Sequence, residues 1–292
     1  MTATLPKSAA TSRSGARGRT RRSSGARPGT GRLAGIVAVA VVFTAPLVWM
    51  VLAAFKTNVQ IGNPAEAIVF RPTLRNFGTV FEQGVFLPAM WNSLVVGVVS
   101  TALSAVLAVP AAWAIGRFAM QRFGNWVLIA RIIPAVSLLV PWYYLFAQLE
   151  LVGGYTVLVL SHMFVSVPLI TWIMIGFFAG LPVELEEAGR VDGLSAFGAF
   201  LRISLPLATA GTATACVLAA VFSWNNFMFA LILSGENTKT LPVALFNFIS
   251  YASVDWGGLM AAATLMSVPV VAAAVFGQKY LVAGLTAGAT KG

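Results

Sequence analysis

The sequence predicts an all-α membrane protein with six transmembrane helices and both ends of the chain in the cytoplasm. Hydrophobic residues make up 58% of the 292 residues and charged residues only 10%, and the mean hydropathy is +0.85. A soluble domain of this length needs more polar surface to cover its core. Several apolar runs also reach the length of about 20 residues that a helix needs to cross a bilayer.

The first 32 residues form a basic segment ahead of the first apolar run. Eight of the 19 Lys and Arg residues lie here, without an acidic residue and among Ser, Thr, Gly and Ala. Such a segment cannot bury enough apolar surface to fold, so residues 1–32 are predicted to be a disordered cytoplasmic tail. No apolar residues directly follow Arg21 and Arg22, and the run that begins at Leu33 is longer than the core of a signal peptide. We therefore expect the first helix to be retained.

Six apolar runs are the predicted spans: 33–55, 91–115, 126–149, 156–178, 207–231 and 258–280. The first is treated as a separate transmembrane helix. Residues 88–280, which contain spans two to six, are predicted to form the core, and residues 281–292 a cytoplasmic C-terminal tail. Five of the runs contain proline, which frees backbone groups within a span and favours kinked helices.

The orientation follows from the basic residues of the connecting segments, because these favour the cytoplasmic side. An N-terminus inside places the tail and six further basic residues in the cytoplasm: Arg117, Arg122, Arg190, Arg202, Lys279 and Lys291. It places only four basic residues outside: Lys56, Arg71, Arg75 and Lys239. Aromatic residues such as Trp49 then lie near a membrane surface, where amphipathic rings are favoured.

A polar stretch, residues 184–207, separates spans four and five and is predicted to form two short cytoplasmic helices. Pro182 suits the first turn of the first helix, and the acids that follow it suit the positive end of the helix dipole. Gly193 can take the left-handed conformation that ends a helix, and Ser195 can cap the second helix. We expect Leu185 and Ala188 on one side of the first helix and the acids on the other, with the small Ala188 and Gly189 allowing another surface to approach.

The same stretch resembles the cytoplasmic signature of permease subunits of ATP-binding-cassette (ABC) importers. That signature reads EAA, three residues, G, nine residues, I-x-L-P. This chain has Glu187-Ala188-Gly189, then Gly193, then Ile203-Ser204-Leu205-Pro206, with the same spacing. Gly189 replaces the second alanine, which loosens the helix by about 1 kcal/mol but keeps the side chain small.

Other segments resemble the carbohydrate-uptake branch of this family, in the subunit type of the maltose permease G protein. They are the pair Asp192-Gly193, the run Leu205-Pro206-Leu207, Trp224-Asn225-Asn226-Phe227, Lys239-Thr240-Leu241-Pro242 and the C-terminal GQKYLVAGLTAGATKG. Thr290 departs from a usually aliphatic position. The resemblance covers residues 33–292 and excludes the basic tail.

The resemblance implies a multi-pass protein of the bacterial cytoplasmic (inner) membrane that works in an assembly. The implied partners are a second permease subunit, two copies of a cytoplasmic ATPase subunit, an extracytoplasmic sugar-binding protein and the lipid bilayer. It implies that the short helices dock on the ATPase, through Glu187, Ala188, Gly189, Asp192, Gly193, Ile203, Leu205 and Pro206. The segment after Gly284 is implied to enter the ATPase interface.

No catalytic residues and no metal ligands are predicted for this chain. It has no G-x-x-x-x-G-K-[ST] phosphate loop, so no cofactor is expected here, and ATP and magnesium are expected in the partner ATPase. Sugars are bound by aromatic stacking and by amide hydrogen bonds, which makes Tyr143, Asn225, Asn226 and Phe227 the candidates for the substrate path. A nucleic-acid role of the tail is not expected.

An ion-coupled secondary transporter of small polar solutes is the alternative class. Such proteins place ionisable residues near the middle of the membrane. Only His162 and Arg131 would serve that purpose here. We expect His162 to be a packed, hydrogen-bonded residue and Arg131 to lie near the inner end of span three.

Overall fold

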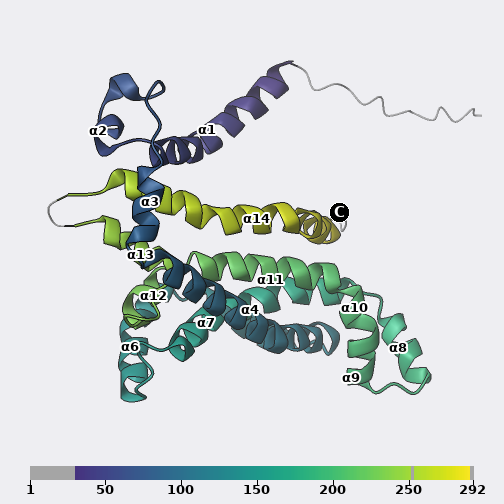
Figure 1. Cartoon of the computed structure of the whole chain (residues 1–292). Helices are drawn as coiled ribbons and strands as arrows, with labels where there is room; N and C mark the ends of the chain where they lie inside the picture. The colour runs from purple at the N-terminus through teal and green to yellow at the C-terminus, as the bar shows by residue number, and fades with distance from the viewer. Residues whose placement is uncertain (1–29, 251–252, 290–292) are drawn as a thin grey trace, which may run out of the picture. The chain divides into compact units, whose positions relative to one another are not determined.

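The computed structural model describes residues 30–250 and 253–289, with side chains described for 31–250 and 253–278. Most of the predicted basic tail, residues 1–29, lies outside the described residues, as do residues 290–292. The chain divides into two compact units, Met1–Pro46 and Leu47–Gly292. In the first unit the described residues belong to helix α1 (Thr30–Ala54), whose side chains there are exposed. The second unit contains all the other elements (Figure 1).

The described part of the chain is helical and contains no named strand. Four of its helices are long and apolar enough to cross a membrane: Gly31–Ala54 within α1, α4 (Phe86–Arg117), α7 (Tyr155–Gly180) and Trp256–Gln278 within α14 (Trp256–Ala289). These correspond to predicted spans one, two, four and six. Two further pairs of helices qualify as spans only if each bent pair is counted as one. The side of the membrane on which each end lies stays a prediction.

Predicted span three is not one straight helix. It consists of α5 (Gln121–Ile132), the short turn η2 (Ala135–Leu138) and α6 (Leu139–Gln148), and its two halves meet at 86°. Pro134 lies at the break, and a proline disfavours the helical conformation in the residue before it. Ile133 is accordingly extended, with φ −66° and ψ 119°.

Predicted span five is also broken. The helix α11 (Thr209–Trp224) stops short of the predicted end at residue 231, and α12 (Met228–Leu233) follows as a separate piece. Two asparagines account for the break, because their amides compete with the helical backbone bonds. Asn225 Nδ2 donates to the Val221 carbonyl over 2.8 Å, and Asn226 Oδ1 accepts from the Phe229 N–H over 3.3 Å.

Helices α4, α7 and α11 pack against one another in the centre of the second unit. Their contact is lined by small and apolar side chains, including Ala112, Ile170, Met174, Ala215 and Ala219. Figure 1 shows α8 (Val183–Val191) and α9 (Ala196–Ala199) at one end of this bundle, and α6, α12 and α13 (Leu241–Ala244) at the other. The polar stretch and the last connecting loop therefore lie at opposite ends of the bundle.

The connecting segment after α1 and the last loop pack together at the second of these ends. They contain α2 (Asn58–Ile61), η1 (Pro64–Glu66), α3 (Arg75–Glu82) and η4 (Leu245–Phe248). A buried cluster joins Ala54 of α1, Val80 of α3, Phe86 of α4, Leu241 of α13 and Ala261 of α14. Loop contacts over long sequence separations thus hold this end of the second unit together.

Candidate functional site

Residues 183–207, the signature hairpin, form the two short helices that the sequence predicts. The first, α8, ends at Val191, and Gly193 follows with φ +92°, a conformation that glycine adopts without a steric penalty. Ser195 Oγ accepts from the Gly198 N–H over 3.1 Å and caps α9. Pro182 lies at the N-cap position of α8, one residue before the first turn where it was expected. The hairpin continues through the π-helical turn η3 (Phe200–Ser204) into α10 (Leu205–Leu207).

Glu186 anchors the signature hairpin to the transmembrane bundle. Its side chain is buried, and its Oε1 accepts from Arg117 Nη2 over 2.6 Å and from Trp113 Nε1 over 3.0 Å. Ser204 Oγ donates to the same oxygen from the far side of the hairpin. The prediction that the acids of α8 share one outward side was wrong for Glu186, because this carboxylate pairs with the arginine that ends α4.

The surroundings of Glu186 keep its carboxylate ionised. Burial raises the pKa of Glu186, but the hydrogen bonds from Arg117, Ser204 and Trp113, together with the charge of Arg117, lower it by more. The net pKa is therefore below the ordinary value of 4.5. A buried charge is retained only when it is paired in this way, so the contact acts as an ionic clamp between the hairpin and α4.

Gly189 is small because another part of the hairpin fills the space beside it. A Cβ at this position would lie 2.5 Å from Ile203 Cδ1 and 3.2 Å from Leu194 Cδ1. We expected another surface to approach Gly189, and the group that does so is the Ile203 side chain of the same chain. The first and last parts of the signature are therefore in contact, and this contact closes the hairpin.

The outward side of the hairpin presents the remaining residues of the predicted docking set. Glu187, Ala188, Asp192 and Gly193 are exposed. A hollow of about 440 Å³ lies beside them, lined by Glu187, Arg190, Val191, Leu194, Ser195 and Ala196. Apolar side chains accompany these polar ones, with Val191 88% exposed and Phe197 55% exposed. Exposed apolar groups next to polar ones are typical of a surface that binds another protein.

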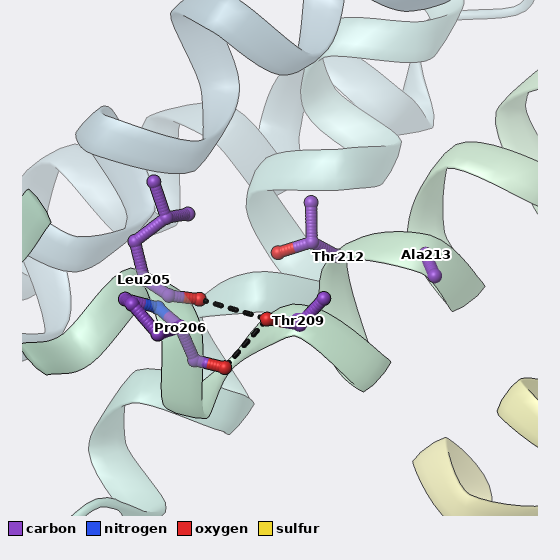
Figure 2. Close-up of a pocket in the computed structure, with 5 residues that line it drawn as sticks. All are labelled: Leu205, Pro206, Thr209, Thr212 and Ala213. Atoms are coloured by element: carbon purple, nitrogen blue, oxygen red, sulfur yellow. Dashed lines mark hydrogen bonds between the residues drawn. The ribbon is translucent and has the colours of Figure 1, made fainter.

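Leu205 and Pro206 lie where the hairpin turns into the bundle. The chain bends by 76° between residues 196–207 and α11, at Ala208. Figure 2 shows the Thr209 hydroxyl directed at the carbonyls of Leu205 and Pro206, and both hydrogen bonds are present. A second hollow, of about 510 Å³, is lined by these three residues with Thr212 and Ala213. Span five was expected to begin at residue 207, whereas the straight helix α11 begins after this bend, at Thr209.

The four substrate-path candidates lie at the other end of the bundle. Asn225, Asn226 and Phe227 form the break between α11 and α12, and Phe227 stacks on Phe246 with ring centroids 5.0 Å apart. Helix α6 contacts α12, but the Tyr143 ring itself is exposed. The neighbouring Trp142 packs on Phe229 instead, at 5.5 Å.

The two residues that support the alternative class have structural partners. His162 is buried, as expected, and its Nδ1 lies 2.6 Å from Ser223 Oγ in the contact between α7 and α11. Arg131 is exposed on α5, with its guanidinium 5.1 Å from the centre of the Trp172 ring. Among the residues that the structure describes, neither His162 nor Arg131 is part of a group of charged side chains within the bundle.

Residues 100–287 match the family described as the binding-protein-dependent transport system inner membrane component. The matched range contains the whole signature hairpin and its anchor Arg117. The chain belongs to this family. The membrane fold and the family resemblance drawn from the signature are therefore confirmed.

Relatives of this permease cover most of its length. It is 36% identical to the probable ABC transporter permease protein y4oR of Sinorhizobium fredii, over 87% of this chain and 92% of the relative. It is 30% identical to the trehalose/maltose transport system permease protein MalG of Thermococcus litoralis, over 88% and 95%. A bacterial ABC transporter involved in alginate import shares the fold, with a TM-score of 0.73 and 19% identity over 87% of this chain and 98% of that one.

Sequence reasoning missed the residues that hold the permease's hairpin and its last loop in place. Trp113 lies near the end of predicted span two and Arg117 just beyond it, and their pairing with Glu186 crosses about 70 residues of sequence. Asn92 is buried near the start of α4, donates to the carbonyls of Asn237 and Lys239, and accepts from the Tyr155 hydroxyl. A polar residue inside an apolar run was the only signal available for Asn92.

Proposed function

We propose that this permease is one of two transmembrane subunits of an ATP-driven importer for a sugar. A second permease completes the translocation path, and two copies of a cytoplasmic ATPase subunit bind ATP and magnesium. An extracytoplasmic binding protein delivers the sugar. ATP-driven closure of the ATPases favours one of two conformations of the permease pair. The family membership supports this proposal most directly.

The signature hairpin supports a role in coupling. Its inward side is held to α4 by the Glu186 clamp, so a force on the hairpin reaches the bundle through a charged, buried contact. Its outward side offers Glu187, Asp192 and exposed apolar groups beside a hollow. A rigid element with one anchored and one exposed face is suited to transmit the movement of a partner. We assign ATPase docking to Glu187, Ala188, Asp192 and Gly193, with Gly189, Ile203, Leu205 and Pro206 shaping the hairpin.

The docking role predicts a charge-reversal phenotype. Glu187→Lys changes an exposed side chain, so the permease should still insert in the membrane but lose both sugar uptake and co-purification of the ATPase. Gly193→Asp should have the same effect, because it also strains the positive φ of the elbow. The matched control is Glu236→Lys in the last loop, whose side chain is 84% exposed at the opposite end of the bundle. Normal uptake and ATPase recovery in Glu187→Lys would refute the docking role.

The sugar class is proposed from the relatives. One relative is named as a trehalose/maltose transport system permease protein, and in this chain an asparagine pair breaks predicted span five. We propose that Tyr143, Asn225, Asn226 and Phe227 line the sugar path. Asn226→Ala should then reduce uptake without loss of ATPase binding, measured with the sugar that the co-purified binding protein retains. Unchanged uptake in this variant would remove Asn226 from the path.

The orientation and location follow the same proposal. The distribution of basic residues supports an orientation with the signature hairpin and both termini in the cytoplasm. The family is described as an inner membrane component, which supports the same location for this chain. The last loop, with Lys239, then faces the extracytoplasmic side. A cysteine introduced at Glu236 should react with a membrane-impermeant thiol reagent in intact cells, and one at Glu187 should not. The reverse pattern would contradict this orientation.

A further inference from the structure

The segment after α1 contains a fully buried lysine with an unusual set of neighbours. Lys56 has no exposed surface. Its Nζ lies 4.5 Å from the centre of the Trp49 ring and 4.5 Å from the centre of the Phe70 ring, and donates to the Ala67 carbonyl over 2.6 Å. A buried ammonium is costly unless its charge is balanced, and aromatic faces and a carbonyl provide that balance. Helix α1 and residues 67–70 therefore converge on one cation.

This arrangement fixes where residues 67–70 lie relative to the last turns of α1. Trp49 is five residues before the end of α1 at Ala54, or about 7.5 Å below it along a helix axis. The Lys56 side chain must fold back from the end of α1 to reach the Trp49 ring. Since Ala67 and Phe70 contact the same nitrogen, the backbone between them lies beside the last turns of α1. A tryptophan near the end of a membrane-crossing helix marks the headgroup level.

The two residues held at this level are apolar and uncovered. Ile68 is 83% exposed and Val69 is 82% exposed, although the residues on both sides of the pair are held by Lys56. Charged residues, Glu66 and Arg71, bound the short apolar stretch. An apolar tip with charged edges is typical of segments that lie in the membrane interface. If Ile68 and Val69 faced water, their apolar surface would stay hydrated, which is unfavourable when lipid at the same level could cover it.

We propose that Ile68 and Val69 insert into the interface of the lipid bilayer beside the end of α1, and that the Lys56 contact with Trp49 and Phe70 holds them there. The partner is the lipid surface itself. Residues 67–70 then anchor the end of α1 at Ala54 to the membrane surface. The described side chains of α1 are largely exposed along its length. This inference rests on α1 crossing the membrane and is independent of the cargo and of ATPase docking.

The test uses the full chain, purified with its partner subunits in nanodiscs of phosphatidylcholine and phosphatidylglycerol. Ile68→Cys and Val69→Cys are made in a Cys216→Ala background and labelled with an environment-sensitive fluorophore. Phe43→Cys, on an exposed position of α1, is the lipid control, and Glu236→Cys is the water control. Nitroxide-labelled lipids should quench the fluorophore at both loop positions as they do at Phe43, with a blue-shifted emission.

Two results would overturn the proposal. Quenching of both loop positions only by a water-soluble nitroxide, as at Glu236, would place them in solvent. A change in emission only when the binding protein is added would make the pair a protein contact instead. The positioning role of Lys56 has its own readout: Lys56→Met in the Val69→Cys chain should reduce quenching by lipid while leaving that at Phe43 unchanged. Equal lipid quenching in both chains would contradict that role.

Discussion

Glu186 and Glu187 are adjacent acids of the signature hairpin with opposite environments. Glu186 is buried and bound by Arg117, Trp113 and Ser204, whereas Glu187 is exposed beside the hollow. On a helix, neighbouring positions point in directions that differ by about 100°, so one acid anchors the hairpin and the other faces outward. Substitutions of the two acids should therefore differ in kind, one affecting stability and the other affecting association.

Glu186→Gln should destabilise the permease. It leaves Arg117 as a poorly compensated buried charge, and breaking a buried ion pair costs about 3–5 kcal/mol. The thermal unfolding temperature of the detergent-purified chain should fall clearly, with Glu184→Gln, an exposed acid on the same helix, as the matched control. Equal melting temperatures for the two variants would contradict the anchoring role.

The same carboxylate predicts a pH dependence. Because the folded state lowers the pKa of Glu186 below 4.5, the ionised form binds more favourably in the folded chain than in the unfolded one. The Glu186 carboxylate therefore contributes its full stabilisation above pH 4.5, the ordinary pKa. This stabilisation is lost as the pH falls through the lower pKa of the folded chain. The difference in melting temperature between the native chain and Glu186→Gln should be constant from neutral pH down to about 4.5 and shrink below it. A difference that shrinks on the alkaline side would contradict the assignment.

Gly189 and Ile203 should behave as a coupled pair. Gly189→Ala improves helix propensity by about 1 kcal/mol, but its Cβ would lie 2.5 Å from Ile203 Cδ1. Ile203→Val removes that atom, so the double variant should be more stable than the sum of the single effects, by about 0.5 kcal/mol or more. Thermal unfolding of the four chains measures the coupling. Gly176→Ala combined with Ile203→Val should be additive, since a Cβ at Gly176 meets nothing within 4 Å.

At the scale of the element, the elbow between α8 and α9 depends on the backbone of one residue. Gly193 has φ +92°, where a residue with a Cβ is disfavoured by about 1–2 kcal/mol. Gly193→Ala should therefore loosen the hairpin even though a Cβ would meet nothing within 4 Å. Protease sensitivity of the hairpin and the melting temperature both report this change. The control Gly176→Ala, at an ordinary helical φ, should leave the protease sensitivity and the melting temperature unchanged. The same result for Gly193→Ala would contradict the role of the positive φ at this position.

The bent helices show the same dependence on single residues. Pro134 divides predicted span three, and the amides of Asn225 and Asn226 divide predicted span five. Both breaks lie inside runs that the sequence predicted as continuous spans. A hydropathy pattern therefore identified these two apolar runs along the chain but not their bends.

At the scale of the whole molecule, transport should require the energy of a partner. Vesicles that contain the complete complex and the binding protein should take up sugar only with ATP on the hairpin side. A proton ionophore should leave uptake unchanged, because the described part of the bundle contains no chain of ionisable residues to carry protons. Uptake that needs no ATP and is abolished by the ionophore would support the ion-coupled alternative, in which His162 is a candidate proton carrier.

The sequence by itself determined the membrane character, the apolar runs, the signature spacing and the caps of the hairpin. These properties depend on composition or on residues a few positions apart, as Ser195 and Gly193 illustrate. Only the tertiary structure decided which acid of α8 turns inward, what fills the space beside Gly189, and which groups contact the Lys56 ammonium. The partners of these groups are distant in sequence or separated by folded turns, as with Arg117 for Glu186. Local periodicity carries no information about such pairs, because their contact depends on how whole helices pack.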